Sequence, residues 1–141
     1  MSKKRNPMSD HHTALVYTMV LVSAADRDMT DSELLTIGDT VQHLPVFADY
    51  DLNEVPKAAQ ACAELLAQED GLEKILHFIT DKLPSKLSET AYAIALDVAA
   101  ADSAVSQEEL RLLEMLRHRL QVGRLPAAAI ERGTRARNMR L

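Results

Sequence analysis

The sequence is poor in the residue types that build β-sheets and tight turns. It contains no tryptophan, two phenylalanines, three tyrosines and four glycines among 141 residues. Alanine, leucine, glutamate and glutamine are abundant instead, and these residues favour helices, whereas sheets prefer β-branched and aromatic side chains. The composition therefore predicts an all-α protein, and the length suits one globular domain.

Cysteine and long hydrophobic runs are also scarce. Cys62 is the single cysteine, which excludes a disulfide within the chain. The longest apolar tracts, 14–25 and 91–101, are shorter than the roughly 20 residues that a membrane-spanning helix needs. The first residues also lack the apolar stretch of a signal peptide. We therefore expect a cytoplasmic protein without a transmembrane segment, in which both tracts form buried helices.

Positive charge is concentrated at both ends of the chain. Residues 1–9 carry three basic residues and residues 132–141 carry four arginines, so a formal net charge of −5 leaves −12 for the residues between them. An acidic segment repels phosphate backbones, which disfavours nucleic acid and favours metal ions or basic partners. We expect a flexible basic N-terminus over residues 1–8 and a single helical domain over 9–141 with an arginine-rich C-terminal end. Those arginines complement the dipole of the last helix or, alternatively, contact nucleic acid or an anionic membrane.

Capping residues followed by apolar repeats of helical period predict about seven helices. Thr30 with Glu33, and Ser106 with Glu109, have the spacing of a capping box. Pro84 is expected to end one helix, because proline disfavours helical geometry in the residue before it. The predicted helices cover approximately 9–25, 30–45, 51–68, 70–83, 85–101, 106–120 and the residues from 126 onward. The apolar stripe expected on the sixth helix consists of Leu110, Leu113, Leu116 and Leu120.

An internal repeat is the most informative feature of the sequence. The segments 22–34 (VSAADRDMTDSEL) and 98–110 (VAAADSAVSQEEL) align at a constant offset of 76 residues, with six identities. In each copy a short turn joins the end of a buried helix to the start of an amphipathic helix, and Met29 or Val105 is expected to plug the turn into the core. We therefore expect two pseudo-symmetric helix-turn-helix units in a compact bundle, joined by the third and fourth helices.

Both repeated turns are acidic, which makes them candidate cation sites. An EF-hand is excluded, because Val22 and Ala24 stand where that loop needs its first and third ligands, and the second copy departs in the same way. Carboxylate oxygens suit hard cations such as calcium, magnesium or manganese, whereas transition metals usually recruit His or Cys. The candidate metal ligands are Asp26, Asp28, Asp31, Glu33, Asp102, Glu108 and Glu109.

These acidic residues also have a simpler interpretation as helix caps. An aspartate before a helix and a glutamate in its first turn are favoured by capping and by the helix dipole alone. Both interpretations stay open at this point. Of the two turns, the first is the better candidate, because it has four carboxylates within eight residues, where the second has alanine and glutamine at two of the matching positions. Arg27 partly neutralises this first cluster, so a weak affinity is expected.

The duplicated acidic motif resembles the tellurite-resistance TerB-like family. The resemblance rests on AADRDMTDSEL and AAADSAVSQEEL and covers approximately residues 15–120. It implies a compact seven-helix fold, two turns that bind divalent metal, and a role in bacterial stress responses with protein partners in a membrane-associated complex.

Motifs of common enzymes are missing from the sequence. It has no Gly-rich phosphate loop, no Gly-x-Ser-x-Gly elbow and no dinucleotide fingerprint. His43, His77 and His118 lie on three predicted helices without the spacing of a zinc or di-iron site. We therefore expect a non-enzymatic acidic binding module, or alternatively a metal-independent adaptor in which the turns are only caps. A metal-dependent hydrolase has no nucleophile or base constellation in its favour.

Two single residues carry further expectations. Cys62 lies among alanines and leucines, which favours a small buried hydrophobe over a nucleophile. Asp97 interrupts the apolar run of the fifth predicted helix, at the position that matches Leu21 in the repeat. It marks either the wet face of that helix, which we favour, or a buried and hydrogen-bonded carboxylate.

Overall fold

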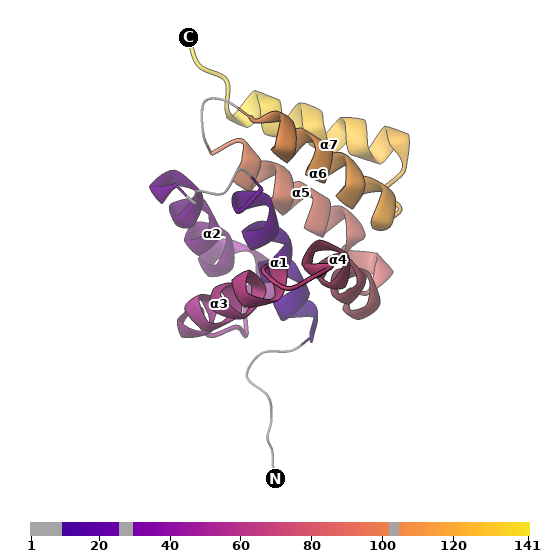
Figure 1. Ribbon diagram of the computed structural model, residues 1–141. Helices are drawn as coiled ribbons and strands as arrows, with labels where there is room; N and C mark the ends of the chain where they lie inside the picture. Colours follow the sequence, from indigo (N-terminus) through magenta and orange to yellow (C-terminus); the bar gives the residue numbers. More distant parts are fainter. Residues whose placement is uncertain (1–9, 26–29, 102–104) are drawn as a thin grey trace.

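The computed structural model describes residues 10–25, 30–101 and 105–141. Over these ranges the chain forms seven α-helices and three short 3₁₀-helices, with no strand. Figure 1 shows how the α-helices are arranged. The predicted all-α fold is confirmed. The elements in chain order are α1 (Asp10–Ser23), α2 (Asp31–His43), η1 (Pro45–Phe47), η2 (Leu52–Glu54), α3 (Val55–Leu66), α4 (Gly71–Lys82), η3 (Ser85–Leu87), α5 (Ser88–Ala99), α6 (Gln107–Arg119) and α7 (Arg124–Arg137).

Helices α1 and α5 form the centre of the fold. Both are apolar nearly all round, and such a helix is stable only where other helices surround it. Helix α1 packs against α5, α3 and α4, and α5 packs against α1 and α7. Leu15, Met19 and Ile94 are among the largest fully buried side chains. The two apolar tracts of the sequence are therefore the core helices, as expected.

The pseudo-symmetry of the repeat is visible in the packing. Helices α2 and α6 occupy residues 31–43 and 107–119, which are in register at the offset of 76. Each of them packs on both core helices, α1 and α5. The symmetry also extends further than the two predicted helix-turn-helix units, because α3 covers α1 as α7 covers α5 (Figure 1). Each unit therefore has three helices, and α4 links them.

Local chemistry explains where several helices begin and end. Helix α3 begins at Val55 and not at Asp51, because the Asp51 side chain accepts the Asn53 N–H at 3.0 Å and starts η2 instead. Helix α4 begins at Gly71, where a Cβ would collide with the carbonyl oxygens of Leu65 and Leu66. The preceding residue, Asp70, has a positive φ of 60°. The corner between α3 and α4 is thus tight enough to require glycine.

Several aliphatic side chains that were expected to face the core lie at the surface. Val105 is 40% exposed, so it does not plug the second turn, and Met29 lies outside the described residues. Leu110 is 51% exposed, and Leu112 takes its place in the buried face of α6. The periodicity of α6 allows either leucine to face inward, and the packing of α6 on α5 and α1 decides between them.

Candidate functional site

Both repeated turns end in a complete capping box. In the first, the Glu33 N–H donates to Thr30 Oγ1 at 3.2 Å, and the Thr30 N–H donates to Glu33 Oε1 at 3.0 Å. In the second, the Glu109 N–H donates to Ser106 Oγ at 3.0 Å, and the Ser106 N–H donates to Glu109 Oε1 at 2.9 Å. The two predicted helix starts are confirmed.

The two capping glutamates are buried, which the sequence did not reveal. Glu33 is 0% exposed and Glu109 is 1% exposed. Burial of a carboxylate is unfavourable unless its oxygens find donors or a cation. Oε1 of Glu33 has the N–H of Thr30, but Oε2 of Glu33 is also buried and accepts no hydrogen bond from the residues that the structure describes. This oxygen is a potential cation ligand at the N-terminus of α2.

The other predicted ligands fall into two groups. Asp31 and Glu108 are exposed at the starts of α2 and α6, each close in sequence to the buried glutamate of its own turn. Asp26, Asp28 and Asp102 lie outside the described residues. Over the ranges 10–25, 30–101 and 105–141, no three His, Cys, Asp or Glu side chains are grouped as metal ligands would be. A cation at the first turn would thus need Asp26 or Asp28 in addition to Glu33.

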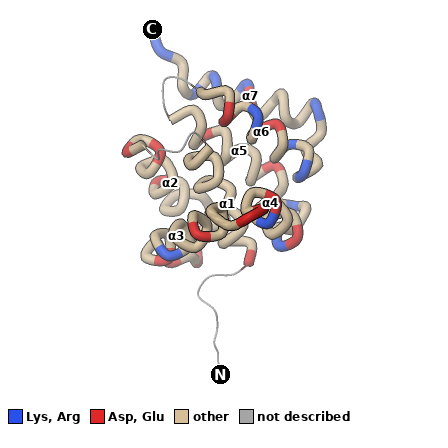
Figure 2. The backbone as a smooth tube through the Cα atoms, viewed as in Figure 1, with Lys and Arg blue, Asp and Glu red and all other residues tan. Residues whose placement is uncertain are grey.

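Charge is divided between the two units. Residues 31–66, from α2 to α3, carry seven acidic residues and one lysine, whereas residues 107–137, from α6 to α7, carry four acidic residues and seven arginines. Figure 2 shows acidic residues along α2 and around α3, and basic residues interspersed with acidic ones on α6 and α7. The excess of arginine lies on α7, which has four arginines and one glutamate, whereas α6 has three arginines and three glutamates.

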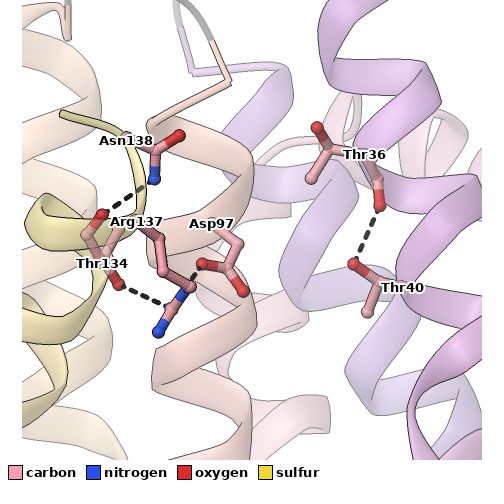
Figure 3. A network of polar contacts seen from close by, with 6 residues as sticks. All are labelled: Thr36, Thr40, Asp97, Thr134, Arg137 and Asn138. Carbon is pink, nitrogen blue, oxygen red and sulfur yellow. Dashed lines mark hydrogen bonds and ion pairs between the residues drawn. The ribbon is translucent and has the colours of Figure 1, made fainter. Parts of the chain in front are cut away.

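Asp97 lies at the surface and binds an arginine of α7. The guanidinium of Arg137 donates to Asp97 Oδ1 at 3.1 Å and to Thr134 Oγ1 at 3.4 Å (Figure 3). The side chain of Asp97 is 34% exposed, which confirms the predicted wet face of α5. One arginine of the C-terminal end thus fastens α7 to α5. The network also includes Asn138, whose side-chain amide donates to the Thr134 carbonyl at 2.8 Å.

Cys62 and a cavity beside α6 are two further candidates. Cys62 is 0% exposed, and burial raises the pKa of its thiol to about 12, so the nucleophilic thiolate is suppressed.

A cavity of about 330 Å³ opens between the end of α1, the α3–α4 corner and α6. Its lining is mainly aliphatic, and Glu108 and Arg111 contribute charged groups; the apolar residues are Leu21, Ala24, Ala25, Leu66, Leu72, Leu112 and Met115.

Comparisons with known proteins identify no relative. No family model, curated protein or solved structure matches the chain. The family resemblance accordingly rests on the two acidic motifs. A separate property concerns membranes: none of the helices over the described ranges is long and apolar enough to cross a bilayer.

Proposed function

We propose that this chain is a non-enzymatic helical binding module whose first acidic turn takes a hard divalent cation. The observation that carries the proposal is the buried Oε2 of Glu33, which accepts no hydrogen bond over the described part of the chain. An unsatisfied buried carboxylate oxygen is unfavourable, and a cation supplies what it lacks. Asp26 and Asp28 precede it in the sequence and offer further oxygen ligands. Calcium, magnesium and manganese are the candidate ions.

The sequence resemblance to the TerB-like family also supports a metal-binding module. It further implies a role in a bacterial stress response, linked in the family to tellurite resistance, with protein partners in a membrane-associated complex. A cytoplasmic location fits that setting. In such a complex the cation would hold the start of α2 in place beside a partner, and the protein itself would perform no chemistry.

A metal-independent adaptor is the second candidate function. It is favoured by the two capping boxes, because Glu33 and Glu109 each already accept the N–H of the capping residue at 3.0 and 2.9 Å. This role explains why both turns have a glutamate in the capping box, although the second turn lacks carboxylates at two of the positions where the first turn has them. The two functions differ in a measurable property: a cation that binds only the folded state raises its stability.

The deciding experiment compares two conservative variants. Glutamine replaces glutamate in capping boxes, so Glu33→Gln removes the charge but keeps the cap, and Glu109→Gln is the matched control. Thermal unfolding is measured with and without calcium, magnesium or manganese. At ten times a dissociation constant of about 10⁻³ M, typical of loosely built calcium sites, the expected gain is about 1.4 kcal/mol in wild type and Glu109→Gln. Glu33→Gln is expected to gain nothing.

Isothermal titration of Asp26→Asn and Asp102→Asn then locates the site. We expect loss of heat in the Asp26 variant alone. Equal loss in both variants would indicate one site shared by the two turns. No heat and no stabilisation in wild type would refute metal binding and leave the adaptor.

A further inference from the structure

The outer face of α2 carries an aliphatic residue between two acidic ones. Asp31, Leu35 and Asp39 follow each other at intervals of four residues, so they share one face of the helix. All three are exposed, and Leu35 is exposed by 69%. The opposite face of α2 is the buried one, with Ile37 and Val41. We name Asp31, Leu35 and Asp39 the acidic stripe.

The outer face of α7 carries the complementary pattern. Arg124, Ala128 and Arg132 are also spaced by four residues, and all three are exposed. A small residue thus stands between two cations, and Leu125 beside Arg124 is 81% exposed. We name Arg124, Ala128 and Arg132 the basic stripe.

The two stripes match in length as well as in chemistry. In each, the charged residues are eight positions apart, which is about 12 Å along a helix. The leucine of one stripe would stand over the alanine of the other, where the short side chain lets two helices approach closely. Within the described residues, none of the four charged members makes an ion pair inside the chain. Their charges are therefore available to a partner.

We propose that the chain associates with itself head to tail, the acidic stripe of one copy docking on the basic stripe of the next. The partner is a second copy because the chain itself presents both halves of the contact, with opposite charges at equal spacing. The overall division of charge favours the same orientation, since residues 31–66 carry seven acidic residues and one lysine, whereas α7 carries four arginines and one glutamate (Figure 2). Because the two surfaces differ, the contact is heterologous and produces rings or chains.

Sedimentation equilibrium tests the proposal on the full-length protein. The average mass is expected to rise with protein concentration at low salt. It is expected to return to that of the monomer in about 1 M NaCl, where the Debye length is about 3 Å. A monomer at millimolar concentration and low salt would overturn the proposal.

Charge-reversal variants test whether the acidic and basic stripes form the contact between copies. D31K/D39K and R124E/R132E are each expected to weaken self-association by about tenfold or more, because like charges then face each other. A mixture of the two variants is expected to associate again, since each acidic stripe then meets a basic one. D81K/E89K and K74E/K86E make the same changes of net charge at exposed positions of α4, η3 and α5 and are expected to associate as wild type does.

The mixture separates a surface effect from damage to the fold. Two misfolded variants would not restore each other, and far-ultraviolet circular dichroism verifies that each remains helical. Failure of the mixture to associate when both variants are folded would overturn the pairing of the stripes. A monomer that binds anionic phospholipid vesicles or nucleic acid through Arg124 and Arg132 would overturn it too, by assigning α7 to another partner.

Discussion

In both units a buried glutamate accepts the N–H of the residue that caps the next helix, Thr30 in one unit and Ser106 in the other. The surroundings of these caps differ. Leu21 is 2% exposed beneath the α3–α4 corner, whereas its counterpart Asp97 reaches solvent and holds Arg137. The repeat has thus kept the interactions that start α2 and α6 and changed those that depend on the neighbouring helix. On the same framework, residues 31–66 of one unit are acidic, whereas α7 of the other is basic.

The largest effect is expected from exchanging the residue types at the matched positions Leu21 and Asp97. Leu21→Asp places a carboxylate in a buried site without a cation and is expected to destabilise the protein by about 3–5 kcal/mol. Asp97→Leu removes one partly exposed ion pair, which is worth at most about 1 kcal/mol. Urea denaturation monitored by circular dichroism measures both. Similar losses in the two variants would show that the units do not differ at this position.

The interface of α3 with α1 is expected to respond to alkaline pH through Cys62. Its pKa is raised by burial from 9.0 to about 12, so stability from the neutral thiol is complete below pH 9 and is lost as the pH rises to about 12. In that window the free energy of unfolding falls by up to about 1.4 kcal/mol per pH unit for one group. Subtracting the pH profile of the free energy of unfolding of Cys62→Ala from that of wild type separates the contribution of the Cys62 thiol from that of the tyrosines. Identical profiles would mean that the thiol is not shielded.

Removing the caps compares the two conserved helix starts directly. Thr30→Ala and Ser106→Ala are each expected to lower the free energy of unfolding by about 0.5–2 kcal/mol, because each leaves one backbone N–H without its acceptor. Similar losses in urea would support a cap that the two units share. A loss in one variant alone would show that only that unit depends on its N-cap for stability.

The smallest effect concerns the polar contact between α5 and α7. The Tyr92 hydroxyl donates to Glu131 Oε2 at 2.6 Å, whereas the packing of α3 on α1 includes the apolar Cys62. Tyr92→Phe is expected to lower the free energy of unfolding by about 1 kcal/mol. An unchanged urea midpoint in this variant would show that the Tyr92 hydroxyl contributes nothing to holding α7 on α5.

Local sequence patterns predicted the helices, the two capping boxes and the burial of α1 and α5. These features depend on residues a few positions apart, so spacing and residue type are enough to predict them. The candidate site was predictable in part. The positions of Glu33 and Glu109 followed from the capping-box spacing, but their burial did not, because burial depends on helices distant in the sequence.

Which leucines lie inside and where charge gathers depend on how the helices pack together. Leu110 and Leu112 both fit the apolar period of α6, and the packing of α6 on α5 and α1 places the second in the core. Asp97 and Arg137 are 40 residues apart and meet because α7 lies along α5. The acidic and basic stripes likewise come from helices at opposite ends of the chain. A linear pattern fixes which residues share a helix face, but the face that remains exposed is set by the helices that cover the others.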